Sequence, residues 1–370
     1  MKTKIIKNIK GLYNLFGWST SRKIVVIESD DWGSIRMPSI EVYNKFRQKG
    51  FDLTNSDYNR LDSLECNDDL SELLGVLDSY KDSIGNSAVI TANMVVGNPD
   101  FRKIKESGFT EYHVEKVEET LSRYDHHDRV LSLWKEGYSK HLFYPQFHAR
   151  EHVNVVRWMD ELNKRTKEIL YSFENGTTFS GKGDYSFMEV LDYNTPKDLH
   201  FMKESLKEGL NMFEELFGFR SKSFIPPCYA WDSNVEDTLA KGGVKYIQGL
   251  FVQCVPTGTF GEYKRKYHFM GSKNSYGQRY LVRNCFFEPS ITNNNDPVGE
   301  CLQRIQYSFR YNKPAIISSH RINFIGALVK KNREVNLILL GKLLKEIVKR
   351  WPDVEFMTSD QLGDLMTAND

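Results

Sequence analysis

The chain contains 370 residues, of which 50 are basic and 49 acidic, so its formal net charge is +1 at pH 7. This balance excludes a general electrostatic attraction to nucleic acid, and the hydrophobic fraction of 40% is ordinary for a soluble globular protein. The length exceeds that of most single domains, although α/β barrels of this size fold as one unit.

Cysteine usage and the N-terminus indicate a cellular location. The five cysteines are odd in number and no pair has C-x-x-C spacing, which is typical of reduced thiols. No apolar run is long enough for a membrane span, and the first residues lack the apolar stretch and cleavage site of a signal peptide. We therefore expect a cytoplasmic protein.

Residues 1–22 form a basic segment in which lysines alternate with apolar residues. This pattern fits an amphipathic helix that caps the fold. The alternative is a peripheral contact between residues 1–16 and a membrane surface.

Strand-like and helix-like patterns alternate through the rest of the chain. In chain order, we expect a strand at 23–29, a helix at 68–79, strands at 88–96 and 141–147, helices at 149–165 and 196–217, a strand at 222–225, a helix at 233–241, strands at 244–248, 279–287 and 314–319, a helix at 332–350 and a strand at 354–357. In the helix at 332–350, Val335, Leu339, Leu343 and Ile347 should share one face. The alternation indicates parallel strands joined by crossover helices, in a barrel or a large open sheet.

Two motifs at predicted strand ends carry candidate chemistry. Asp30 and Asp31 follow the first strand, and the string HAREH at 148–152 follows the strand at 141–147. Ligands bind at the carboxyl ends of strands in such folds. On a helix, His148 and His152 would lie one turn apart on one face and could reach the same metal, with Asp31 as third ligand. Two imidazoles and one carboxylate leave an open position for water, whose pKa the metal lowers.

Two further groups complete a hydrolytic site. Asp30 would accept the proton of the water, and a protonated His320, which follows the strand at 314–319, would donate a proton to the leaving group. If these motifs meet in space, the protein is an enzyme.

The order of the motifs resembles the polysaccharide deacetylase superfamily, the NodB-homology or carbohydrate esterase family 4 group. The family motif T-F-D-D corresponds to ESDD at 28–31, H-[ST]-x-x-H to HAREH, R-x-P-Y/W to FIPPCY at 224–229, and L-x-H to ISSH at 317–320. The resemblance implies a distorted (β/α)7 barrel over residues 23–370 as a single catalytic domain. It also implies a metal, usually zinc with Co, Mn or Ni as alternatives, that Asp31, His148 and His152 hold, with Asp30 as base and His320 as acid. The implied reaction removes an N-acetyl or O-acetyl group from a carbohydrate.

The sequence departs from the family pattern in several places. The third-motif arginine is absent near Ile225, and Arg283 is considered as its replacement from another strand. The fourth-motif aspartate is not evident, and Ala149 stands where the family has Ser or Thr. A long interval between the first two motifs predicts an insertion around 36–86 that lies over the mouth of the site.

Aromatic and polar residues beside strand ends are candidates for stacking on a sugar or for hydrogen bonds to its hydroxyls. These substrate-binding candidates are Trp32, Asn93, Arg150, Tyr229, Trp231, Arg283 and Arg321.

The expected function is therefore metal-dependent deacetylation of an acetylated carbohydrate, without a nucleic-acid partner. One alternative is a barrel that binds glycans without turnover. The other is a zinc protease, because HAREH also fits H-x-x-E-H with Glu151 as base. The sequence leaves open the identity of the sugar, the choice between amide and ester, and the oligomeric state.

Overall fold

A computed structural model describes residues 16–54, 56–181, 186–292 and 294–368. Its main sheet has the strand order β10-β7-β6-β5-β2-β1-β12-β11, with β13 paired to β1, and every pairing in this sheet is parallel. The strands are β1 (Lys23–Trp32), β2 (Ile90–Val95), β5 (Phe143–Ala149), β6 (Ser223–Phe224), β7 (Tyr246–Gly249), β10 (Arg279–Val282), β11 (Cys285–Phe286), β12 (Ala315–His320) and β13 (Val354–Met357).

One segment joins the two ends of this curled sheet. β10 pairs with β7, and β11, only two residues further along the chain, pairs with β12. Between them, Arg283 N–H donates to Gly249 O at 2.8 Å and Asn284 N–H donates to Ile316 O at 3.1 Å. The predicted strand 279–287 is thus split between two neighbours. Counted as one, and with β13 set aside because it pairs only with β1, it gives seven strands around the described sheet, in agreement with the expected distorted (β/α)7 barrel.

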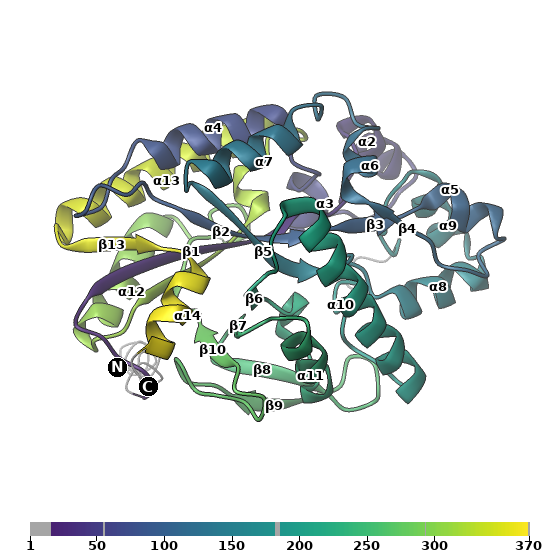
Figure 1. Cartoon of the computed structure of the whole chain (residues 1–370). Helices are drawn as coiled ribbons and strands as arrows, with labels where there is room; N and C mark the ends of the chain where they lie inside the picture. Colours follow the sequence, from purple (N-terminus) through teal and green to yellow (C-terminus); the bar gives the residue numbers. More distant parts are fainter. Residues whose placement is uncertain (1–15, 55, 182–185, 293, 369–370) are drawn as a thin grey trace, which may run out of the picture.

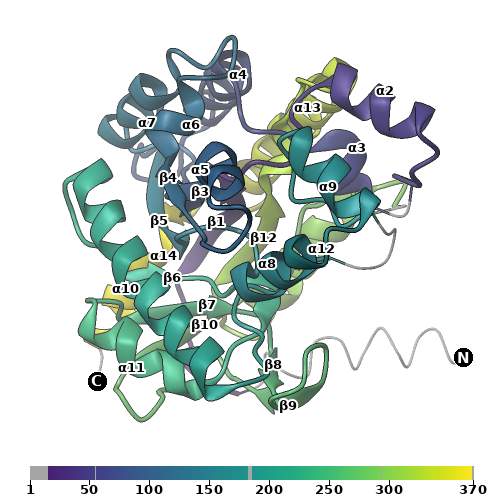
Figure 2. The ribbon, with the colours of Figure 1, turned by 90° about the vertical axis from the view of Figure 1, so that its right-hand side faces the viewer.

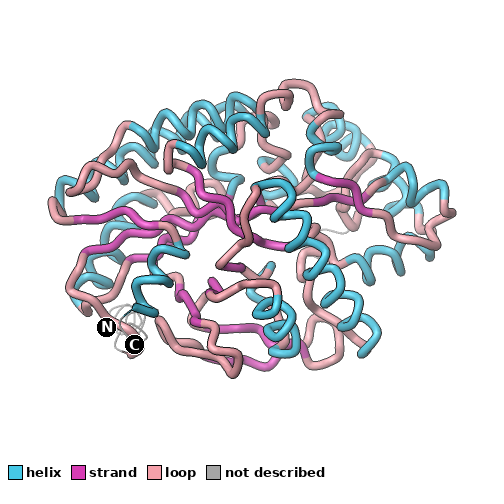
Figure 3. Tube along the Cα trace, viewed as in Figure 1, coloured by secondary structure: helices cyan, strands magenta, loops and turns pink. Residues whose placement is uncertain are grey.

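Helices cover the outside of the sheet (Figures 1 and 3). They are α4 (Asn67–Asp78), α7 (Val130–Ser139), α10 (Pro196–Phe217), α11 (Ser233–Lys241), α12 (Pro297–Arg310), α13 (Lys330–Arg350) and α14 (Ser359–Ala368). The predicted boundaries of α10 and α11 are confirmed. A capping box between Thr195 and Asp198 begins α10, and Gly218, with a φ of 79°, ends it.

Shorter elements gather at the carboxyl ends of the strands, on the side of the molecule that faces the viewer in Figure 2. They include α2 (Ile40–Gln48), α3 (Asp57–Leu61), β3 (Gly97–Pro99), α5 (Phe101–Glu106), β4 (Val114–Lys116), α6 (Val117–Leu121), α8 (Val155–Lys164), α9 (Lys167–Glu174), the 3₁₀ turns η2 (Pro227–Tyr229) and η3 (Arg321–Phe324), and the hairpin of β8 (Val252–Pro256) and β9 (Tyr263–Tyr267). Rings of Phe46, Phe51, Tyr171 and Phe179 pack together and join α2 to the segment around α9.

Two expectations about helices are wrong. The helix predicted at 149–165 begins only at Val155, because Asn154 caps it by accepting a hydrogen bond from Arg157 N–H at 3.2 Å. In α13, Leu343 and Ile347 are buried as predicted, beside Leu337, Leu340 and Leu344, but Val335 is 41% exposed and does not belong to the buried face.

The expectations for the N-terminal segment lie mostly outside the described residues. Of the stretch proposed for membrane contact, only residue 16 is described. Within the described ranges, no helix combines the length and the apolar character needed to cross a bilayer.

Candidate active site

The carboxyl ends of β1 and β5 bring the three predicted metal ligands together. Asp31 Oδ1 lies 3.1 Å from His152 Nε2 and 3.4 Å from His148 Nε2. Among the described residues, this trio is the group whose ligand atoms all lie within 4.8 Å of one another. The expectation that both histidines share a helical face is wrong, because His148 belongs to β5 and His152 to the loop before α8.

Irregularities in the two strands explain how these side chains reach the mouth. The pairing of β1 with β2 shifts register between Ser29 and Trp32, and Asp31 has a φ of 78°. The pairing of β2 with β5 shifts at Met94, so that His148 is the extra residue. Successive side chains of a regular strand point to opposite faces, and a bulge changes where they point. Because of these bulges, residues that are adjacent in one strand, such as Asp30 and Asp31, can both point into the same site.

The chemistry of this trio fits a divalent metal. His148 Nδ1 lies 2.8 Å from Ile225 O, which makes Nδ1 the donor and leaves Nε2 as the free acceptor. The buried His148 Nε2 atom has no hydrogen-bond partner among the described residues. Burial lowers the pKa of His152 to about 4, so its imidazole is neutral. Burial acts to raise the pKa of Asp31, but the contact with His152 and the charge of Arg36 hold it well below its ordinary value. Two imidazoles and one carboxylate match a zinc-type donor set with an open position.

Asp30 is fixed by buried partners at the inner end of the site. Both of its oxygens accept hydrogen bonds from Arg283 at 2.7 Å, and Asn93 Nδ2 donates to Oδ1 at 2.7 Å. Arg283 also donates to Glu28 Oε2 at 2.6 Å. Burial acts to raise the pKa of Asp30, but the guanidinium of Arg283 lowers it to about 2. Asp30 is therefore ionised, and Arg283 contacts it as an orienting arginine would.

His320, the predicted acid, is paired with a residue that the sequence did not assign to it. Its Nδ1 lies 2.6 Å from Glu288 Oε1 and its Nε2 lies 3.6 Å from Asp30 Oδ2. Burial acts to lower the pKa of His320, but Glu288 raises it to about 9. The imidazole is therefore protonated at neutral pH. The one sequence feature that could have pointed to Glu288 as a partner is its position, because it immediately follows the predicted strand 279–287.

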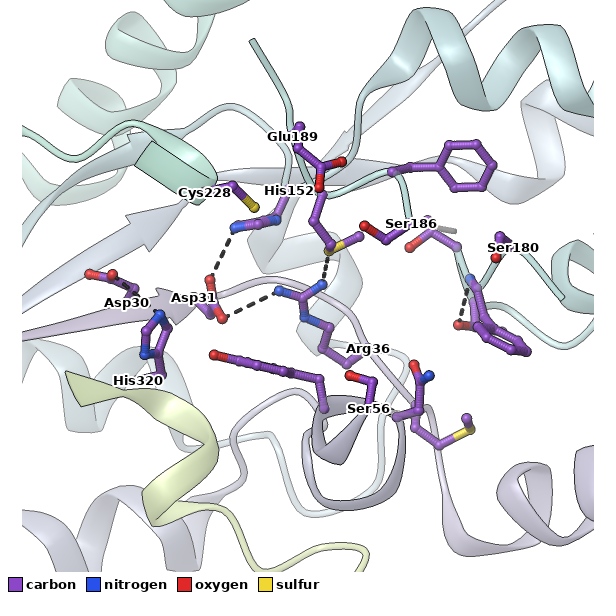
Figure 4. A pocket seen from close by; sticks show the side chains of 18 of the residues that line it. Asp30, Asp31, Arg36, Ser56, His152, Ser180, Ser186, Glu189, Cys228 and His320 are labelled. Atoms are coloured by element: carbon purple, nitrogen blue, oxygen red, sulfur yellow. Dashed lines mark hydrogen bonds and ion pairs between the residues drawn. The ribbon is translucent and has the colours of Figure 1, made fainter. Parts of the chain in front are cut away.

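These groups line a cavity of about 320 Å³. Figure 4 shows Asp30, Asp31, His152 and His320 at one end of it and Ser180 and Ser186 at the other. The lining residues are Asp30, Asp31, Arg36, Met37, Ser56, Tyr58, Asn59, His148, His152, Thr177, Thr178, Phe179, Ser180, Ser186, Phe187, Met188, Glu189, Pro226, Cys228, Tyr229 and His320. The wall away from the histidines comes from the loops around α3 and after α9. The sequence did not single out individual residues of this wall, because they follow no strand end and no periodic pattern.

Only Tyr229 of the seven substrate-binding candidates lines this cavity. Trp32 is buried in the core, where its indole N–H donates to Ser29 Oγ at 3.1 Å. The indole N–H of Trp231 donates to Glu236 Oε1 at 3.0 Å. Both indoles therefore pack and form hydrogen bonds within the protein interior. This corrects the expectation that Trp32 and Trp231 stack on a sugar.

The polar candidates also turn away from the cavity. Asn93 and Arg283 are buried against Asp30, Arg150 pairs with Glu151 and Glu208, and Arg321 pairs with Asp62 and Glu65. These side chains form hydrogen bonds and ion pairs within the protein, because a buried charge or amide requires a polar partner. The expectation that Asn93, Arg150, Arg283 and Arg321 touch substrate is corrected accordingly.

Glu151, the base of the alternative protease mechanism, does not line the cavity of the histidines. It accepts hydrogen bonds from Arg150 Nε at 2.5 Å and from Ser205 Oγ at 3.1 Å, and it is 1% exposed.

Comparisons with known proteins give structural neighbours only. Neither a scan of protein-family models nor a search of curated proteins finds a match. Among solved structures, the chain is similar to a polysaccharide deacetylase from Mycobacterium smegmatis at 11% identity, covering 96% of this chain and 93% of that one, with a TM-score of 0.43. A polysaccharide deacetylase from Pseudomonas aeruginosa is 9% identical, with coverage of 93% and 91% and a TM-score of 0.47. A CE4 family pseudoenzyme from Bacillus anthracis is 11% identical, with coverage of 92% and 65% and a TM-score of 0.36.

Proposed function

We propose that this protein is a metal-dependent hydrolase that removes an acetyl group, in the first instance an N-acetyl group, from a carbohydrate. The observation that carries the proposal is the meeting of two sets of groups in one cavity. The Asp31, His148 and His152 trio lies beside an acid–base pair of opposite charge, Asp30 and His320.

The trio would hold a divalent ion, with zinc as first choice and Co, Mn or Ni as alternatives. When bound, such an ion lowers the pKa of a coordinated water and polarises the scissile carbonyl. The chain's own residues would do the remaining work. Asp30, ionised above pH 2 and fixed by Arg283, would accept a proton from the attacking water. His320, protonated below about pH 9, would donate a proton to the leaving nitrogen or oxygen.

The substrate that suits this cavity is small. A volume of about 320 Å³ lies at the lower end of the range for ligand pockets, roughly 300–1,000 Å³. The hydroxyls of Ser56, Thr177 and Ser180 offer partners for sugar hydroxyls, and Tyr229 offers an aromatic face. A nucleotide- or lipid-linked sugar precursor in the cytoplasm fits the odd number of cysteines and the lack of C-x-x-C spacing. Peripheral membrane contact through residues 1–16 remains part of this hypothesis.

The decisive experiment joins metal content with turnover. Elemental analysis should find about one divalent ion per native chain and almost none in His148→Ala. Acetylated monosaccharides, nucleotide sugars and short oligosaccharides should then be screened for acetate release by the metal-loaded protein. Absence of metal from the native chain, after purification without chelators and a zinc soak, would rule out the hydrolase.

The same screen separates the alternatives. A metal-loaded chain that binds acetylated sugars without releasing acetate would be a glycan-binding barrel. The protease alternative predicts that Glu151→Gln abolishes activity, whereas the deacetylase should retain it provided that the variant stays folded. The ion pair of Glu151 with Arg150, away from the main cavity, favours the deacetylase.

A further inference from the structure

An arginine of the predicted insertion contacts the carboxylate of the metal trio. Arg36 Nη2 donates to Asp31 Oδ2 at 3.3 Å, whereas Asp31 Oδ1 is the oxygen nearest to both histidines. Figure 4 shows Asp31 between His152 and Arg36, with one carboxylate oxygen directed to each. The two oxygens of Asp31 therefore have different partners.

Arg36 is itself fixed by further contacts. Its Nε forms an ion pair with Asp62 Oδ2 at 3.3 Å without hydrogen-bond geometry, and its guanidinium carbon lies 5.5 Å from the centre of the Tyr58 ring. Its side chain is 11% exposed. A guanidinium is planar and forms hydrogen bonds in set directions, so contacts on several sides leave it little freedom to rotate.

The contacts continue through a chain of alternating charges. Arg321 donates to both oxygens of Asp62, at 3.2 and 3.0 Å, and to Glu65 Oε2 at 2.8 Å. Glu65 Oε1 accepts a hydrogen bond from Gly33 N–H at 2.9 Å, two residues after Asp31. The side chains of Asp62, Glu65 and Arg321 are fully buried. The network thus begins at the Asp31 side chain and returns to the backbone beside it.

We infer that Arg36 is a positioning residue for Asp31, and that the segment from Arg36 to Glu65 completes the metal site as well as bordering the cavity. This inference rests on the proposed role of Asp31 as a metal ligand. Arg36 holds Oδ2 and so leaves Oδ1 as the single oxygen that faces the imidazoles. Asp62 offsets the guanidinium charge, so the arginine contributes orientation without a net positive charge that would repel a cation.

The test measures metal affinity rather than turnover. Arg36→Met keeps most of the aliphatic stem and removes the contacts to Asp31 and Asp62. Loss of an outer-shell partner of a metal ligand typically weakens metal binding by about 10- to 100-fold. A competition titration with a chromophoric chelator and Zn²⁺ or Co²⁺ should show a loss of this size relative to the native chain.

A matched control comes from another buried arginine. Arg333 pairs with Asp69 at 2.8 Å and with Glu72 at 2.9 Å, and its side chain is 4% exposed, but it does not line the cavity. Arg333→Met should lower the melting temperature and leave metal affinity within about twofold of the native value. Equal losses of metal affinity in the two variants would show a general structural effect and overturn the inference.

The conservative variant adds a second, independent measurement. Arg36→Lys keeps the charge, but one ammonium cannot contact Asp31 and Asp62 as the forked guanidinium does. Its metal affinity should fall between those of the native chain and Arg36→Met, and it replaces that variant if Arg36→Met does not fold. Unchanged or tighter metal binding in a folded Arg36 variant would refute the role of Arg36. Absence of metal binding by the native chain would instead refute the proposed function.

Discussion

The pairing of Glu288 with His320 makes a sharp prediction about pH. The pKa of His320 is raised from 6.5 to about 9, chiefly because Glu288 opposes the effect of burial from 2.6 Å away. That difference corresponds to about 3 kcal/mol in favour of the protonated imidazole. Because the folded pKa is raised, proton donation by His320 is available below about pH 9 and is lost as the pH rises through that value.

Glu288→Gln removes the negative charge and keeps the size of the side chain and a hydrogen-bond acceptor. Burial of His320 then acts with less opposition, and we expect its pKa to fall to about 6.5 or below. At pH 7.5, about a tenth of the chains would then carry the proton, so acetate release should drop roughly tenfold. Activity should recover toward the native rate as the pH is lowered to 6.

The assay is acetate release from pH 5.5 to 10 with saturating metal, so that a change in metal occupancy does not distort the profile. Glu189→Gln is the matched control, because Glu189 lines the cavity that His320 lines but pairs with Arg157 instead of His320. In the Glu189→Gln variant, the loss of activity at alkaline pH should still occur near pH 9. A Glu288→Gln profile that keeps its limb near pH 9, or a loss that low pH does not restore, would refute the assignment of His320 as the acid.

Three further predictions concern stability. Arg283→Met should lower the free energy of unfolding by about 3–5 kcal/mol, because it leaves the buried Asp30 and Glu28 without their cation; a urea titration that shows under 1 kcal/mol would contradict this. The folded pKa of Asp30, about 2 against an ordinary 3.8, stabilises the fold above pH 3.8 and this contribution is lost as the pH falls toward 2; unfolding of Asp30→Asn should show a weaker acid dependence over that window. Gly33→Ala should lower the melting temperature far more than Gly50→Ala, although both have a φ near +80°, because an added Cβ at Gly33 would lie 2.3 Å from Val95 O and one at Gly50 would meet nothing within 4 Å.

Regular elements with strong local signals could be predicted from the sequence. The boundaries of α10 follow from the Thr195 cap, Pro196 and Gly218, and β13 matches its predicted residues. The three proposed metal ligands and the proposed acid–base pair could be placed because each stands near the carboxyl end of a buried strand. The end of a buried strand can be recognised from local sequence. In a parallel sheet the carboxyl ends of neighbouring strands lie at the same edge, so residues at these ends come close together.

The partners of the site residues could not be predicted in the same way. Arg36, Glu288 and Tyr58 approach the site from a loop, from the end of a divided strand and from a short helix, and no spacing relates them to Asp31 or His320. The helical geometry predicted for His148 and His152 failed for a related reason. The register shift at His148 depends on pairing with β2, a contact between segments that local periodicity does not contain.

Two arginines that were predicted to bind substrate instead pair with buried carboxylates, which separates residues that support the site from residues that can touch substrate. Arg283 and Arg321 stand next to strand ends, where a sequence pattern suggests ligand contact, yet each is fully buried against two carboxylates. A cluster of buried acids requires buried cations, since an unpaired charge in the interior is strongly destabilising. Arginines near the strand ends thus hold buried carboxylates at the proposed site in place, and the surface left for substrate comes from loops such as 177–180 and 186–189. We therefore expect substitutions in those loops to change which acetylated sugar is accepted, and substitutions of the arginines to change stability, metal affinity or pH dependence instead.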